Sequence, residues 1–248
     1  MSPSIQSREN RGRAWEIKFV VNPTLAEQIR GWARSRLLPD PNGQGAHRDS
    51  YQISSLYFDT QQLDVFHRRG SYGRGKYRIR RYGESDWVFL ERKLRTRRQL
   101  TKRRVMVELG ALEQLSEAEP QNDWAGYWFC RRLRLRRLGP VCQLTYNRTA
   151  RVAMTQYGPI RLNLDSHLRA RPADSAWFSV AHERAFCGDQ VILEFKFRQT
   201  MPLLFKSLVE EFALNPSRIS KYRLAAVALE LDAPAPMIPI ADRTYEYA

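Results

Sequence analysis

Alternation of apolar and polar residues is the strongest pattern along this chain. In residues 15–21 the odd positions are apolar, and Glu16 and Lys18 lie between them. Successive side chains of a strand point to opposite faces, so this alternation predicts a strand with one apolar and one charged face. Similar patterns and residue types predict eight strands, over residues 15–21, 51–58, 76–82, 87–94, 102–109, 141–154, 159–165 and 191–197.

Helical periodicity and capping residues mark the segments between these strands. Asn22 and Pro23 are a typical cap and first helical residue, and predict a helix that runs to about Leu38. The other predicted helices are a short one from Thr60, a long one over 111–137, one from Thr200 and Pro202 to about Leu214, and one from Ser220 to about Leu231. Residues 39–50, 70–75 and 170–189 have the composition of loops and turns.

The chain shows no internal repeat and no break in composition, which favours one domain. We expect it to cover residues 13–232, between a flexible N-terminus at 1–12 and a Pro-rich tail at 233–248. The expected fold class is α+β, mainly β, with antiparallel strands flanked by helices.

Five of the predicted strands carry Lys or Arg in the middle of the polar face, usually beside a carboxylate. For any single strand, such as the one with Glu91 and Lys93, a solvent-exposed charge pair is the simpler interpretation. All the strands together favour a closed eight-stranded antiparallel barrel, apolar outside under the helices and charged in the lumen. Cations packed in a lumen repel each other and lose hydration, so we expect a polyanion among them, and phosphates fit best.

Composition supports an anionic partner. The 248 residues include 41 Lys and Arg against 26 Asp and Glu, a net charge of +15. Seven of these cations are lysines, and six of the seven lie in the motifs quoted below, Lys206 being the exception. Nucleic acid is an unlikely partner, because the cations alternate with apolar residues on many strands instead of clustering on one outer surface.

Other site classes find little support. The three cysteines, Cys130, Cys142 and Cys187, have no metal-ligand spacing, and neither a dinucleotide-binding loop nor a P-loop is present. The sequence has no run of about 18 apolar residues and no signal-peptide pattern at residues 1–13, so we expect a cytoplasmic protein without a membrane span.

Seven short motifs, in order over residues 13–230, resemble the triphosphate tunnel metalloenzyme (CYTH-like) superfamily, and within it the VTC (vacuolar transporter chaperone) polyphosphate-polymerase domain. They are Glu16-Ile17-Lys18-Phe19, Ser55-Leu56-Tyr57-Phe58-Asp59, Lys76-Tyr77-Arg78-Ile79-Arg80-Arg81-Tyr82, Leu90-Glu91-Arg92-Lys93, Lys102-Arg103-Arg104, Leu193-Glu194-Phe195-Lys196 and Ser220-Lys221-Tyr222.

The resemblance implies roles for particular residues. Arg78, Arg80, Lys196 and Lys221 would act at the reacting phosphates. Further phosphate ligands would be Lys18, Lys93, Lys102, Arg148 and Arg161, and alternation alone adds Lys76 and Arg104. Glu194 would be the principal ligand of a divalent metal, Mn²⁺ or Mg²⁺, with Glu16 as a second ligand.

The implied activity is transfer of the γ-phosphoryl group of ATP to a growing polyphosphate chain. Many tunnel enzymes begin with Glu-x-Glu-x-Lys, but Ala14 replaces the first Glu here, as in much of the VTC branch. Two alternatives stay open on the same scaffold: a hydrolase of triphosphate or nucleoside triphosphate, and a non-catalytic polyphosphate-binding module. Across these functions, the expected binding partners are ATP and polyphosphate or triphosphate.

Overall fold

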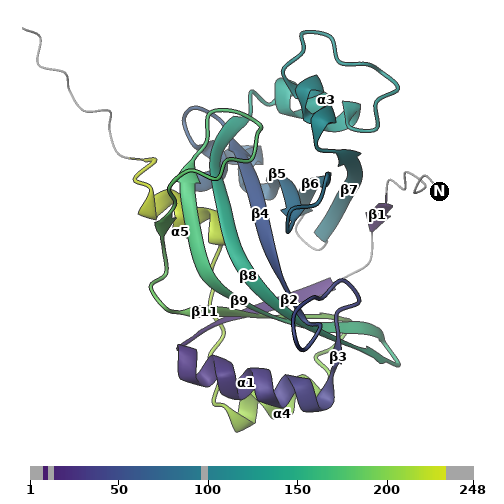
Figure 1. The fold of residues 1–248 in the computed structure, drawn as a ribbon, viewed down its shortest axis with the longest axis vertical. Coiled ribbons are helices and arrows are strands. Elements are labelled where there is room, and N and C mark those ends of the chain that lie inside the picture. Colours follow the sequence, from purple (N-terminus) through teal and green to yellow (C-terminus); the bar gives the residue numbers. More distant parts are fainter. Residues whose placement is uncertain (1–7, 11–13, 96–99, 233–248) are drawn as a thin grey trace, which may run out of the picture.

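The structure is a computed structural model that describes residues 8–10, 14–95 and 100–232 (Figure 1). The predicted Pro-rich tail lies outside these residues. The predicted flexible N-terminus lies mostly outside them too, but Arg8–Asn10 form a strand, β1, which alternation did not predict.

The strands and helices follow in chain order. The strands are β1 (Arg8–Asn10), β2 (Ala14–Val21), β3 (Leu38–Pro39), β4 (Ser50–Asp59), β5 (Gly75–Tyr82), β6 (Trp87–Arg95), β7 (Leu100–Glu108), β8 (Gly139–Thr155), β9 (Gly158–Pro172), β10 (Arg184–Ala185) and β11 (Val191–Arg198). The helices are α1 (Pro23–Arg36), α2 (Asp64–His67), α3 (Tyr127–Leu135), α4 (Leu203–Glu211) and α5 (Lys221–Ala228), with short 3₁₀ helices η1 (Gly70–Arg74) and η2 (Gly110–Leu115).

All eight predicted strands belong to one antiparallel sheet. The path through it is β1-β7-β6-β5-β4-β8-β9-β11-β2, with β3 beside β8 and β10 beside β9. The predicted mainly-β α+β fold is therefore confirmed. Figure 1 shows β4, β8 and β9 running along the long axis of the molecule, with β11 and β2 crossing near their lower ends.

The predicted closed eight-stranded barrel is not confirmed. Within the described residues the sheet has eleven strands, and its path ends at β1 and β2 without pairing between them. Only residues 11–13 separate these two strands along the chain, so the two ends of the path lie at most about 14 Å apart. The sheet is thus strongly curved and has an inner face, but its backbone hydrogen bonds do not form a complete ring.

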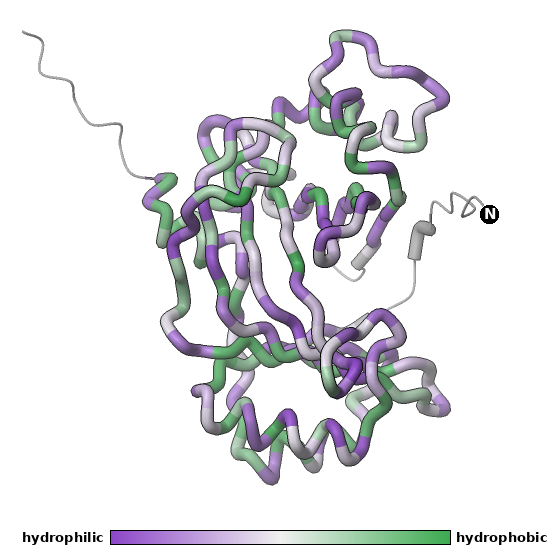
Figure 2. Tube along the Cα trace, viewed as in Figure 1, coloured by the Kyte–Doolittle hydropathy of each residue, from purple (hydrophilic) through white to green (hydrophobic). Residues whose placement is uncertain are grey.

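Helices α1 and α4 cover the outer face at β2, β9 and β11. Phe19, Leu162 and Phe195 are almost completely buried there, against Ile29 of α1 and Phe205 of α4. Both helices are amphipathic, and Figure 2 shows hydrophobic and hydrophilic residues interleaved along α1. The apolar sides of β2, β9 and β11 therefore face outward beneath these helices, as the alternation predicted.

The predicted long helix over 111–137 is wrong. The segment contains η2, a run of turns and bends, and the nine-residue α3. Its middle, from Ser116 to Asp123, includes Pro120 and several polar residues that favour turns, and Pro disrupts a helix interior. Phe129 of α3 is completely buried and packs against Phe58 and Tyr77 on the outer face of the other half of the sheet.

Other element boundaries differ by smaller amounts. Helix α1 ends at Arg36, and Leu38 and Pro39 pair with β8 where a helix end and a loop were predicted. Strand β9 continues to Pro172, and β10 pairs with it inside the predicted loop 170–189. Helices α4 and α5 both end about three residues earlier than predicted.

Candidate functional site

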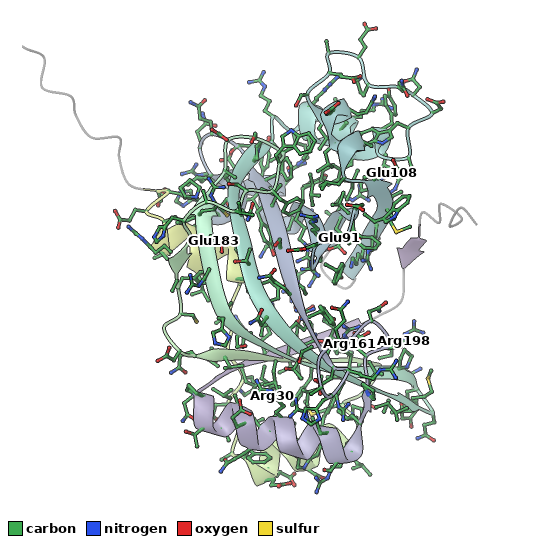
Figure 3. The ribbon with its side chains drawn as sticks, in the orientation of Figure 1. Arg30, Glu91, Glu108, Arg161, Glu183 and Arg198 are labelled. Atoms are coloured by element: carbon green, nitrogen blue, oxygen red, sulfur yellow. The ribbon has the colours of Figure 1, made fainter. Side chains whose placement is uncertain are left out.

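The charged sides of the strands form the inner face of the curved sheet. Every residue proposed above for phosphate or metal binding lies on it or at its edge, in the clusters described below. Figure 3 labels two inner-face residues, Glu91 on β6 and Arg161 on β9. The geometric part of the prediction, that these side chains converge, therefore agrees with the structure.

Glu91 is the centre of the cluster on β5, β6 and β7. Strand pairing places it between Arg78 and Arg104 in one cross-strand row. Its carboxylate, 1% exposed, lies 2.6 Å from the Arg78 guanidinium, 2.6 Å from Lys102 Nζ and 3.4 Å from Arg104 Nε. Burial alone would raise the pKa of Glu91, but the four neighbouring cations, led by Arg78 and Arg80, hold it well below its usual range. Glu91 is thus not half of a surface pair with Lys93.

Arg80 is buried without a carboxylate partner. It is 5% exposed, and its guanidinium donates to the hydroxyls of Ser55 and Tyr146, both at 3.3 Å. No carboxylate of the described residues lies within ion-pair distance of it. Arg78, two residues away, also donates to the Tyr57 hydroxyl at 3.1 Å. Arg78 and Arg80 therefore lie on the same face of β5.

Strands β8, β9 and β11 supply a second buried cluster, which α5 joins. Arg148 donates to both oxygens of Asp165, at 2.6 and 2.8 Å, and Lys221 Nζ lies 2.6 Å from the same carboxylate. Arg148 and Lys196 each lie 3.7 Å from Glu194. Burial would raise the pKa of Asp165, but Arg148 and Lys221 hold it at about 2.

Glu16 connects the two halves of the inner face. Its carboxylate lies 3.1 Å from Lys18 Nζ on the same strand and 2.8 Å from Lys93 Nζ on β6. Since β2 and β6 are not neighbours in the sheet, the contact with Lys93 spans the inner face. This ion pair joins opposite parts of the curved sheet through side chains, at a place where no backbone hydrogen bonds join the strands.

Arg161 and Asp40 lie at one edge of the inner face. The Arg161 guanidinium contacts the buried carboxylate of Asp40 and donates to the Tyr51 hydroxyl at 2.5 Å. Its Nε donates to Asn163, whose amide is 3.4 Å from Glu194. Arg161 is therefore linked to the Glu194 cluster, although the Asp40 carboxylate neutralises the charge of Arg161.

Crowding of the cations shifts several pKa values toward neutrality. Burial, followed by the charges of Lys18 and Lys93, lowers the pKa of Lys76 to about 7, and its Nζ donates to the Ser220 hydroxyl at 2.7 Å. Burial also lowers the pKa of Lys102 to about 8, against the pull of Glu91. Burial would raise the pKa of Tyr82, but Arg80 and Arg104 lower it to about 7. Protonation of Lys76, Lys102 and Tyr82 is disfavoured on this inner face, and a bound anion would offset that effect. The inner face is therefore suited to an anionic ligand.

Glu194 and Glu16 are the two carboxylates that the sequence analysis expected to hold a metal ion. They lie on adjacent strands, and burial and the charge of Glu194 raise the pKa of Glu16, although the nearby lysines lower it overall. Among the described residues no group of three or more His, Cys, Asp and Glu side chains is placed to hold an ion. Two carboxylates still fit Mg²⁺ or Mn²⁺, because Mg²⁺ commonly takes one or two carboxylates and completes its shell with substrate phosphates and water.

Sequence reasoning missed several inner-face residues. Glu91 was placed on the charged face of its strand and in a family motif with Lys93, but it was given no role in the site. The hydroxyls of Tyr57 and Tyr146 hold Arg78 and Arg80, but their stretches have little charge alternation. Asp40 comes from a segment predicted as a loop, and no pattern in the sequence points to it.

Comparison with known proteins agrees with this geometry. The family model described as the VTC domain matches residues 13–229. The chain belongs to the VTC domain family. No curated protein matches it. Within the described residues of this VTC chain, none of the helices combines the length and apolar character needed to cross a bilayer.

Solved structures also resemble this VTC chain. A Bacillus halodurans protein provisionally named an adenylate cyclase has a TM-score of 0.53 and 14% identity, covering 85% of this chain and 95% of that one. A provisional adenylyl cyclase from Hippeastrum, described as having a dominant triphosphatase activity, has a TM-score of 0.47 and 15% identity, covering 90% and 97%. The first likeness shows a shared fold.

Proposed function

We propose that this VTC domain is a phosphotransferase that uses ATP to extend inorganic polyphosphate on the inner face of its curved sheet. In this proposal the inner face, with the N-terminal strands at its edge, acts as the charged tunnel expected from the sequence. The reaction forms a bond between the terminal oxygen of polyphosphate and the γ-phosphorus of ATP and breaks the β–γ bond, so ADP leaves.

The excess of cations on the inner face carries the proposal. Among the residues that the structure describes, eleven cations lie there against five carboxylates, Glu16, Asp40, Glu91, Asp165 and Glu194. Arg80 is the clearest case, since a buried guanidinium with only hydroxyl partners is costly without an anion. A phosphate chain supplies several negative oxygens in a row and matches the guanidinium fork.

The inner-face residues would position the reactants. Arg78 and Arg80 occupy alternate positions of β5 and would clamp adjacent phosphates. Lys196 and Lys221 would neutralise the oxygens of the attacking and leaving groups. The acceptor is already anionic near neutral pH, so positioning and charge neutralisation suffice without a strong general base.

Glu194, with Glu16, would hold the divalent metal. Burial would raise the pKa of Glu194, but Lys196 and Lys18 hold it well below its usual range, so the side chain is an ionised ligand at neutral pH. When bound, Mg²⁺ or Mn²⁺ would offset phosphate charge as the phosphoryl group moves.

Hydrolysis of triphosphate is the second candidate, and one observation favours it. The side chains of Lys93, Lys102 and Lys196 are each 36–38% exposed, so part of the inner face is open to water. Water competes with a phosphate acceptor wherever it reaches the reacting phosphorus.

A polymerase assay tests the proposal. The purified chain is incubated with ATP and Mn²⁺, and long polyphosphate is separated from orthophosphate. We expect chain synthesis by the wild type, and a loss of about 100-fold or more in Glu194→Gln, since metal binding supplies several kcal/mol of charge stabilisation. Glu210→Gln, the same change at an exposed site on α4, should behave as the wild type.

The other possible results of this assay would indicate different functions. Orthophosphate without chains, lost in Glu194→Gln, would establish the triphosphatase and overturn the polymerase. Tight polyphosphate binding without turnover would leave a binding module.

A further inference from the structure

The cations of β5 continue beyond the inner face toward the surface. Arg80, Arg78 and Lys76 occupy alternate positions of the strand, and Arg74 stands two residues before Lys76 at the end of η1. Exposure rises along this series: Arg80 is 5% exposed, the Arg78 side chain is 21% exposed, and Arg74 is an exposed surface residue. Lys76 to Arg80 alone spans about 13 Å of extended strand.

Three more arginines contact η1 or the adjacent helix α2. Arg68 packs against Gly73, where an added Cβ would lie 2.8 Å from the Arg68 carbonyl oxygen. Arg136, from the end of α3, donates to the Ser71 hydroxyl at 3.1 Å and stacks over the Tyr72 ring. Arg223 of α5 lies over the Phe66 ring of α2. We call Arg68, Arg74, Arg136 and Arg223 the Arg74 surface.

The Arg74 surface keeps its positive charge. Within the described residues, no carboxylate lies within ion-pair distance of any of its four guanidinium groups, whereas neighbouring Arg69 is paired with Asp64 at 3.2 Å. Arg68 also contributes to the lowered pKa of Lys76, after the larger effects of burial and of Lys18, Lys93 and Arg78, which agrees with its position near the inner face.

We propose that the Arg74 surface binds the part of a polyphosphate chain that extends past the inner face. This inference rests on the proposed function. A ligand with three phosphates at Arg78 and Arg80 does not reach Arg74, whereas a long chain continues along the same series of cations. Continuity with the inner face favours polyphosphate over a nucleic acid or a membrane, because the ligand already lies in the adjoining site.

Binding of phosphate chains of two lengths tests this inference. Tripolyphosphate and polyphosphate of about one hundred units are titrated against the wild type and the triple variant Arg68→Gln, Arg74→Gln, Arg136→Gln. We expect the variant to bind the long chain about tenfold more weakly, with the slope of log K against log salt reduced by about 2. Tripolyphosphate affinity should not change.

A matched variant controls for the loss of three charges. Arg36→Gln, Arg48→Gln, Arg169→Gln changes three exposed arginines on other elements and should bind both ligands as the wild type does. Equal losses for both chain lengths, or no loss for either, would overturn the inference. A larger loss of affinity for DNA of matched charge than for polyphosphate would also overturn it.

The two proposals fail in different ways. If tripolyphosphate does not bind the wild type, the proposed function itself fails. If it binds but the triple variant retains wild-type affinity for the long chain, only the role of the Arg74 surface fails.

Discussion

Lys76 illustrates how one side chain depends on the whole inner face. Its lowered pKa, about 7, follows from burial and from the surrounding cations Lys18, Lys93 and Arg78. A bound polyanion would reverse this effect by favouring the charged amine. Ligand binding should therefore be coupled to proton uptake by Lys76, with smaller contributions from Lys102 and Tyr82, whose pKa values also lie near neutrality.

The coupling predicts a pH dependence of tripolyphosphate affinity. Above pH 7 the unbound Lys76 is largely neutral, so binding must also protonate it, and affinity should rise as the pH falls from 8.5 to 7. Lys76→Arg stays charged throughout this range. We expect the pH dependence of its Kd, measured by calorimetry, to be shallower than that of the wild type, and protonation of the ligand itself cancels in the comparison. Identical pH profiles would contradict the assignment.

At the scale of elements, α5 is attached to the sheet by a buried hydrogen-bond network. Asp59, 1% exposed, accepts from the backbone N–H groups of Thr60, Val65 and Phe66 and from the Tyr222 hydroxyl at 2.5 Å. The Tyr222 ring also stacks on Tyr57 at 5.2 Å. Because Lys221 precedes Tyr222, this network fixes the start of α5 where Lys221 reaches Asp165.

The network predicts energetic coupling between Tyr222 and Lys221. Tyr222→Phe keeps the stacked ring but removes the hydrogen bond to Asp59, and should weaken tripolyphosphate binding by about threefold to tenfold through misplacement of Lys221. In the Lys221→Met background the same change should have almost no effect. Equal losses in both backgrounds, in a double-mutant cycle of Kd values, would show that Tyr222 does not act through Lys221.

At the scale of the whole molecule, like charge gathers on the inner face of a chain with a net charge of +15. Its carboxylates neutralise only part of the crowded cations, so the unliganded fold retains internal repulsion. An anion that binds there should stabilise the native state both by mass action and by relieving this repulsion.

This repulsion predicts a large thermal shift. At a tripolyphosphate concentration of 100 Kd, linkage alone gives about 2.7 kcal/mol, or an increase of about 5–10 °C in Tm for a chain of this size. The same ionic strength supplied as NaCl is the control and should give a much smaller increase. Equal shifts from both salts, measured by calorimetry, would indicate general screening and not a site.

Much of the fold could be predicted because its strands alternate strictly. A two-residue period on β2, β5, β6 and β11 determines which side chains share a face, whatever the strand order, so the candidate residues were found together. Segments without such a period were predicted less well. The helix over 111–137 was placed by its apolar residues, but Pro120 and the polar stretch around it prevent a continuous helix.

By itself, the sequence determined that cations occupy one side of most strands and apolar residues the other, because side-chain direction in a strand follows from local backbone geometry. Only the tertiary structure decided which charges meet. The contact between Lys93 and Glu16, the burial of Glu91 among four cations and the burial of Arg80 with no carboxylate of the described residues within ion-pair distance all depend on the curvature of the sheet. The curvature of a sheet, and whether its end strands pair, depend on packing between residues far apart in the chain. The alternation therefore predicted a charged interior, but it did not predict that β1 and β2 are unpaired with each other.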